Sequence, residues 1–194
     1  MQLEKYPQAK SYLLSNRDIL ERRTYLLESG RKWYEIWVHQ SPNDFVRDYK
    51  IVTPDITTRN NFALDTKSYF CLGSCFVIIL KDETAENYKY MLGILNSKVL
   101  EYFHKRTSST FIYAGRYRYW TSYMKDYPII SLSSEKAKAG NIGRRIINQV
   151  DDILQAIERN CRSNIEKIEA RLNELVYELY GLTDSEVDKI NEFV

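Results

Sequence analysis

The strongest constraint on the fold is a long row of apolar residues near the C-terminus, spaced by three or four positions. This spacing places them on one side of a helix. Glycine at 181 is a typical C-cap, and Thr183 with Glu186 forms a capping box that opens a short last helix. The row comprises Ile142, Ile146, Val150, Ile153, Ile157, Cys161, Ile165, Ile168, Leu172, Leu175 and Leu179.

Two interpretations of this row remain open. A single helix would be roughly 60 Å long at 1.5 Å per residue, too long to lie wholly over a small core. Part of it would then pack on another helix or another chain, which includes self-association. The alternative is two shorter helices with a bend near Asn160–Asn164.

The preceding residues predict a mixture of helices and strands. We expect helices over 6–23 and 84–105, the second capped by Thr84, and a loop or strand region over 106–130. Short runs rich in β-branched and aromatic residues predict strands at 33–37, 50–53, 62–64, 69–71 and 76–80. The expected fold class is α+β: a domain with a mixed sheet and flanking helices (1–130), followed by a helical region (131–194).

Composition excludes several classes of protein. The 194 residues include 28 basic and 26 acidic ones, which is unlike a histone-like polycation. The longest apolar run, 75–80, is far shorter than a membrane span, and the first residues show no signal peptide. Three cysteines favour a reducing compartment, so we expect a cytoplasmic protein without disulfides or a structural metal.

Charge is distributed unevenly along the chain. Residues 1–130 hold 19 basic and 14 acidic residues, whereas 131–194 hold 9 and 12. Between Glu101 and Asp126 there is no acidic residue, but there are five basic residues and eight aromatic ones, besides several hydroxyls. Basic side chains neutralise phosphates, arginine can pair with guanine, and hydroxyls bind phosphate oxygens.

This segment predicts a surface that binds nucleic acid. The alternative is a solvated basic loop whose aromatic residues face the core. Two weaker clusters contain Arg31 with Lys32 and Arg59 with Asn60. The candidate DNA-contacting residues are Lys105, Arg106, Ser108, Ser109, Thr110, Tyr113, Arg116, Tyr117, Arg118, Tyr119, Arg31, Lys32, Arg59 and Asn60.

Motifs for catalysis are mostly absent. There is no glycine-rich phosphate loop and no Asn/Asp-Pro-Pro-Tyr/Phe tetrapeptide of amino-group DNA methyltransferases. One loose match remains: Asp55, Asp65 and Lys67 follow the Pro-Asp…Asp-x-Lys pattern of many nucleases, in which carboxylates hold Mg²⁺. We therefore expect no catalytic residue, with an autonomous Mg²⁺-dependent nuclease as an alternative. A third function is a protein-interaction module that works through the long helix.

The order of several segments resembles the TaqI-like C-terminal specificity domain, the target recognition domain of type IIG restriction-modification enzymes, which is related to type I specificity subunits. The segments are RKWYEIW (31–37), KIVTPDI (50–56), NFALD (61–65), YFCLGSC (69–75), LGILN (92–96) and LVYELYGLT (175–183).

The resemblance implies recognition of double-stranded DNA on behalf of an N6-adenine methyltransferase domain, and often a nuclease domain. The recognition domain would help to present a flipped adenine. Because their motifs are absent, we expect those domains, with S-adenosylmethionine and Mg²⁺, to lie outside this chain. The chain would be a C-terminal part of a larger enzyme or a separate specificity subunit, and it would hold no cofactor itself.

Overall fold

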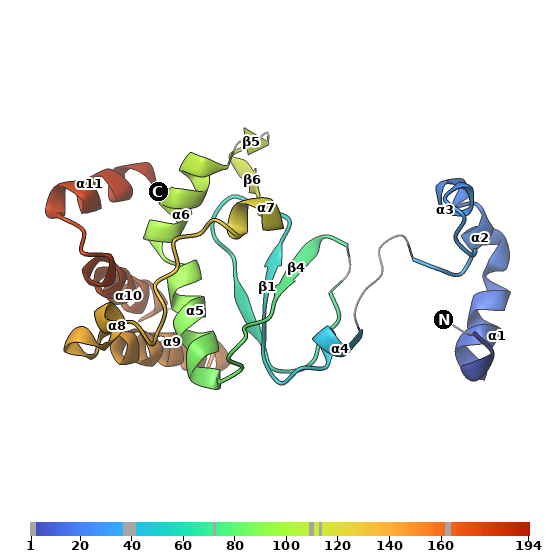
Figure 1. Ribbon diagram of the computed structural model, residues 1–194, viewed down its shortest axis with the longest axis horizontal. Helices are drawn as coiled ribbons and strands as arrows, with labels where there is room; N and C mark the ends of the chain where they lie inside the picture. Colours follow the sequence, from blue (N-terminus) through green and yellow to red (C-terminus); the bar gives the residue numbers. More distant parts are fainter. Residues whose placement is uncertain (1–2, 37–41, 72, 109–110, 113, 162–163) are drawn as a thin grey trace. The chain divides into compact units, whose positions relative to one another are not determined.

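The computed structural model describes residues 3–36, 42–71, 73–108, 111–112, 114–161 and 164–194 (Figure 1). Contacts divide the chain into two units, Met1–Ser41 and Pro42–Val194. None of the described helices is long and apolar enough to cross a membrane.

The first unit is made of short helices: η1 (Leu3–Lys5), α1 (Pro7–Ser15), α2 (Arg17–Glu21) and α3 (Thr24–Glu28). The helix predicted over 6–23 is broken at Asn16, whose side chain donates a hydrogen bond to the Tyr12 carbonyl at 2.8 Å. The prediction of a strand at 33–37 is wrong for residues 33–36, the part that the structure describes. Residues 33–36 form a turn instead, which the Glu35 N–H closes on the Lys32 carbonyl at 2.9 Å.

The second unit confirms the α+β class. After α4 (Pro42–Phe45), strand β1 (Lys50–Pro54) pairs with β3 (Ala63–Asp65) and β4 (Cys75–Ile78). A second sheet has the order β2 (Ile56–Thr57), β6 (Arg116–Arg118) and β5 (Phe111–Ile112). The described strand pairs are antiparallel, so two small antiparallel sheets stand where we expected a mixed one. The strand predicted at 69–71 is not formed, because Tyr69, Phe70 and Cys71 are irregular.

Two helices occupy the region predicted as one over 84–105. Helix α5 (Ala85–Leu95) begins at the predicted cap, where the Thr84 hydroxyl accepts from the Asn87 N–H at 3.3 Å. Helix α6 (Lys98–Thr107) begins in the same way at Ser97. The break lies at Asn96, whose side-chain amide exchanges two hydrogen bonds with the backbone of Phe62.

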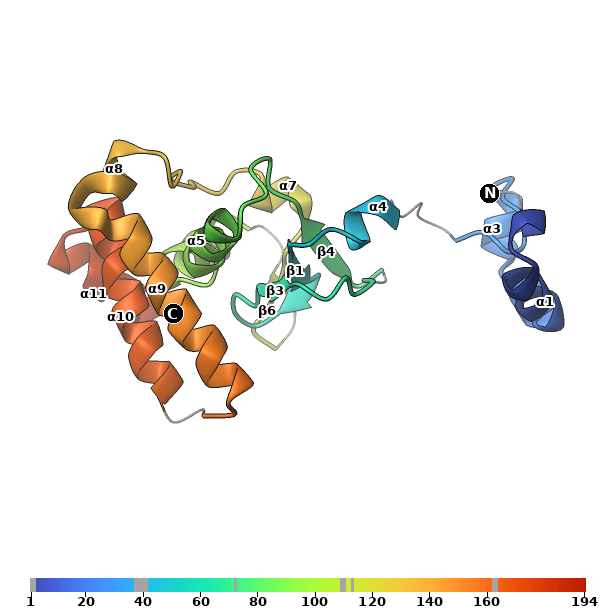
Figure 2. The same cartoon turned by 90° about the horizontal axis from the view of Figure 1, so that it is seen from below.

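The C-terminal region is a helical hairpin. After α7 (Thr121–Met124), α8 (Glu135–Lys138) and η2 (Ala139–Asn141), helices α9 (Ile142–Glu158) and α10 (Ile165–Tyr180) lie side by side (Figure 2). Of the two interpretations, the two-helix one is therefore confirmed. Gly181 ends α10 at φ 69°, and the Thr183–Glu186 capping box opens α11 (Asp184–Phe193), both as predicted.

Helices α9 and α10 share one core with the strands and α5. Gly93 on α5 allows this close approach, since a Cβ there would lie 2.9 Å from a methyl of Ile146. Residues 42–194 thus form one unit with a shared core, and the domain limit at residue 130 stays a prediction. The buried residues of this core include Ile51, Phe62, Tyr88, Ile94, Leu100, Tyr119, Ile146, Val150, Leu172, Val176 and Leu179.

Candidate nucleic-acid interface

The segment without acidic residues runs from 102 to 125. Most of its described part forms the end of α6, the β5–β6 pair and α7, which gather at one end of the second unit (Figure 1). Strand β6 pairs with β2 through Ile56↔Arg118 and Thr57↔Tyr117. Side chains alternate along a strand, so Arg116 and Arg118 lie on one face and Tyr117 on the other. The ring of Tyr117 lies 6.3 Å from that of His104, which places this face against the core.

Tyr119, two residues after Tyr117, also faces the core and is completely buried. Its ring stacks on His104 at 3.9 Å, and its hydroxyl donates to Asn60 Oδ1 at 2.8 Å. The Asn60 amide in turn donates to the Leu95 carbonyl at the end of α5. Both side chains anchor the turn after β2 to the core. We therefore correct the prediction that Tyr119 and Asn60 contact DNA, because neither is exposed to a ligand.

The two basic residues at the end of α6 differ in exposure. Lys105 is only 13% exposed, pairs with Glu101 at 2.6 Å and lies over the Tyr117 ring. Its charge is thus largely neutralised within the fold. Arg106 is exposed and lies over the rings of Tyr102 and Phe193, at 5.5 and 4.9 Å. These contacts hold the guanidinium at the surface, where it suits a phosphate contact.

Arg118 is oriented by contacts with two side chains. Its guanidinium donates from Nη1 to Asp55 Oδ2 at 3.0 Å and lies 4.9 Å from the centre of the Trp120 ring. Trp120 stacks in turn on Tyr123, with an angle of 7° between the rings. Sequence reasoning did not link these residues to Arg118. The i, i+2 spacing of Arg118 and Trp120 in extended backbone was an available signal for a shared face.

The remaining candidates are dispersed. Arg116 and Arg59 are exposed, whereas Ser108 is half-buried at the end of α6. Ser109, Thr110 and Tyr113 lie outside the described residues. Arg31 and Lys32 belong to the first unit, where Arg31 donates to the Ile36 carbonyl and Lys32 lies over the Tyr34 ring. The structure therefore places Arg116 and Arg118 on one face of β6 and Tyr117 on the other, whereas Arg106 lies at the end of α6.

The geometry does not support the alternative Mg²⁺ site. Asp65 pairs with Lys50 at one end of β1, and Asp55 follows Pro54 at the other end. Five residues of extended chain place the two carboxylates on the order of 15 Å apart, but one Mg²⁺ binds oxygens at about 2.1 Å. No group of three or more potential metal ligands occurs among the described residues.

Comparison with known proteins identifies the family of the chain. The family model of the TaqI-like C-terminal specificity domain matches residues 6–129, and the chain therefore belongs to that family. The match ends beside the predicted limit of the recognition domain at residue 130. A type II methyltransferase of Aneurinibacillus aneurinilyticus, M.BanIII, is 35% identical over 125 residues. That alignment covers 64% of this chain but 21% of the relative, so the chain corresponds to about a fifth of that protein.

Proposed function

We propose that this chain recognises a specific sequence in double-stranded DNA for a restriction-modification enzyme. In this proposal, an N6-adenine methyltransferase domain that requires S-adenosylmethionine acts at the site the chain selects. Cleavage, where a Mg²⁺-dependent nuclease domain accompanies it, would depend on the same selection. The observation that carries the proposal is the match to a specificity-domain family over residues 6–129.

The surface around β5 and β6 supports a DNA-binding role. It presents Arg116 and Arg118 on one face of β6, and these two residues and Arg106 belong to a stretch of the sequence without acidic residues. Arg59, which follows β2 in the sequence, is also exposed. Arginine is well suited to both phosphate and guanine, because its planar guanidinium donates two parallel hydrogen bonds. The similarity to a type II methyltransferase supports methylation as the reaction that this recognition directs.

The direct test is fluorescence anisotropy of the full chain with duplexes that have a randomised core, at several salt concentrations. We expect the logarithm of the binding constant to fall linearly with the logarithm of the salt concentration, because phosphate contacts release counterions. Arg116→Ala should weaken specific binding by ~1–3 kcal/mol if it contacts a base. Lys136→Ala on α8 removes an exposed basic residue elsewhere and is the matched control. Absence of binding even at low salt would contradict the proposal.

The rival functions gain no support from the structure. We expect plasmid DNA to stay intact with the chain and Mg²⁺, because Asp55 and Asp65 lie at opposite ends of β1. The helix-mediated interaction relied on an exposed apolar row. Much of that row is buried within the hairpin, including Ile142, Ile146, Val150, Leu172, Leu175 and Leu179.

A further inference from the structure

We infer that Arg118 contacts a guanine base rather than a phosphate, and that Asp55 is the positioning residue that determines this choice. The inference rests on the proposed DNA recognition and deepens it, because it names one base that the domain selects and the residue pair responsible.

Arg118 is constrained on two sides. The Asp55 carboxylate accepts its Nη1–H at 3.0 Å, and the Trp120 ring lies 4.9 Å from the guanidinium carbon. The side chain is still 32% exposed, compared with 22% for Asp55. Of the five N–H donors of arginine, one is used by the ion pair. The remaining donors belong to a planar group whose orientation is set before any ligand arrives, which suits a two-hydrogen-bond contact.

Asp55 is itself held firmly by the backbone. Its N–H donates to the Ser74 carbonyl at 2.8 Å, and its carbonyl accepts from the Tyr119 N–H at the same distance. It lies between β1 of one sheet and β2 of the other, so both sheets fix its position. The carboxylate is thus a rigid support for the guanidinium.

Electrostatics favours a base over a phosphate at this pair. The Asp55 carboxylate balances the Arg118 charge, and a phosphate on the same guanidinium would bring a second negative charge close to the carboxylate. Guanine presents O6 and N7, two neutral acceptors at the spacing of the arginine fork. By contrast, Arg106 lies over the aromatic rings of Tyr102 and Phe193. These rings do not neutralise its charge, which therefore suits a phosphate contact.

A second observation concerns the other oxygen of Asp55. Its Oδ1 atom is buried and has no hydrogen-bond partner among the residues that the structure describes. A buried acceptor without a partner costs stability, so the carboxylate is not explained by folding alone. Its interaction with Arg118 gives it a function that justifies this cost.

The test is selection from duplexes with a randomised core by the full chain and by Arg118→Lys and Asp55→Asn. We expect the wild-type protein to enrich a motif containing guanine. Arg118→Lys keeps the charge but not the fork, so discrimination at one G·C position should fall about 10- to 100-fold, with the others unchanged. Asp55→Asn should lower the same discrimination and raise affinity for unrelated duplexes severalfold, because the Arg118 charge is no longer balanced.

Several outcomes would overturn the inference. An unchanged motif in both variants would do so and leave the proposed DNA recognition intact. Uniform loss of affinity on all duplexes in Asp55→Asn, with its thermal unfolding lowered, would assign Asp55 a merely structural role. A weaker salt dependence of Arg118→Ala without loss of base preference would make Arg118 a phosphate contact. If the wild-type chain enriches no motif, the proposed function itself falls.

Discussion

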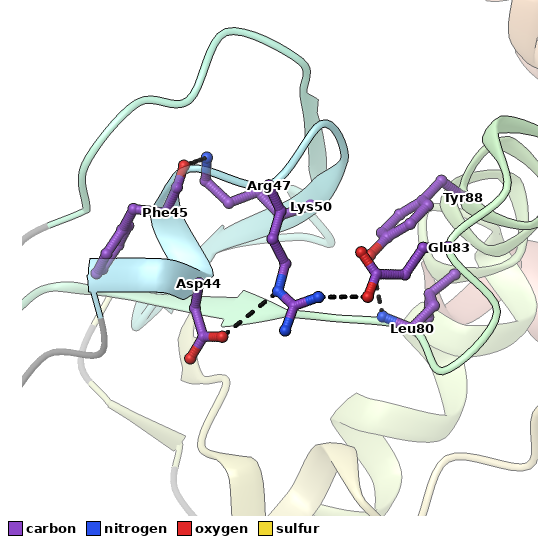
Figure 3. Close-up of polar contacts among 7 residues, drawn as sticks. All are labelled: Asp44, Phe45, Arg47, Lys50, Leu80, Glu83 and Tyr88. Carbon is purple, nitrogen blue, oxygen red and sulfur yellow. Dashed lines mark hydrogen bonds and ion pairs between the residues drawn. The ribbon is translucent and has the colours of Figure 1, made fainter.

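Lys50 Nζ lies 2.5 Å from Asp65 Oδ2, and both side chains are buried where β1 and β3 pair. Lys50 also donates to the Phe45 carbonyl at 2.8 Å (Figure 3). Burial would raise the pKa of Asp65, but hydrogen bonds from Lys50 and from the N–H groups of Lys67 and Tyr69 lower it overall. The Asp65-x-Lys67 pattern therefore brings the backbone of Lys67 to the carboxylate. The Asp65 carboxylate thus stabilises a turn, and this structural role explains the pattern without a nuclease site.

Removing one partner of this pair should destabilise the second unit strongly. Asp65→Ala leaves the Lys50 ammonium buried without a counter-charge, and we expect a loss of about 3–5 kcal/mol in the free energy of unfolding. Chemical denaturation followed by circular dichroism measures it. Glu135→Ala breaks the exposed Glu135–Lys138 pair and is the control, with no measurable change expected. Equal effects of the two substitutions would show that the buried pair is not a major contribution.

His104 should make stability depend on pH in a defined window. Burial, with a further effect of the Lys105 charge, lowers the pKa of His104 to about 4, whereas the unfolded value is about 6.5. Between these values the unfolded chain binds a proton that the native state does not bind. Stability is therefore complete above pH ~6.5 and is lost as pH falls towards 4, by roughly 3 kcal/mol in all.

Urea denaturation between pH 7 and 4.5 checks this expectation against His104→Asn. The variant keeps a polar group near Nδ1, which contacts the Tyr127 hydroxyl at 2.9 Å, but does not titrate. It should be less stable at pH 7 and lose less stability on acidification than the wild type. Parallel curves for the two proteins would mean that His104 titrates normally in the folded state.

Gly93 should tolerate no larger residue. A Cβ there would lie 2.9 Å from Ile146 Cγ2 and 3.0 Å from Val150 Cγ2, both on α9. Gly93→Val should force α5 and α9 apart and cost about 1–3 kcal/mol, measured from the denaturation midpoint. At Gly73 a Cβ meets no atom within 4 Å. Gly73→Ala should therefore change stability by less than about 0.5 kcal/mol, and a similar loss in both variants would refute the steric explanation.

Local signals predicted much of the fold. The caps at Thr84, Thr183 and Gly181 depend on side chains and backbone within one turn, and the structure confirms them. The break at Asn96 was missed because the apolar period continues across it, while its cause is a pairing with distant Phe62. The strand predicted at 33–37 failed over its described part because β propensity is effective only where a neighbouring strand pairs with it.

The candidate site was predictable as a segment but not residue by residue. Alternation separates Arg116 and Arg118 from Tyr117, but a sequence does not reveal which face of a strand is buried. This is why Tyr119 was assigned to the surface although it is fully buried. The pairing of Arg118 with Asp55 joins residues 63 positions apart. Composition cannot predict such a contact.

The second unit should fold only when its helical hairpin is present. Tyr90 donates to the Ile130 carbonyl at 2.9 Å, and α9 covers Gly93 and its neighbours on α5. A chain of residues 42–194 should unfold cooperatively, because its core is complete without the first unit. Residues 42–130 alone would expose core positions that Ile146, Val150 and Leu172 normally cover, and should lack a cooperative transition in thermal circular dichroism. A cooperative transition in that shorter chain would show instead that the recognition domain ends near residue 130, as its sequence pattern predicted.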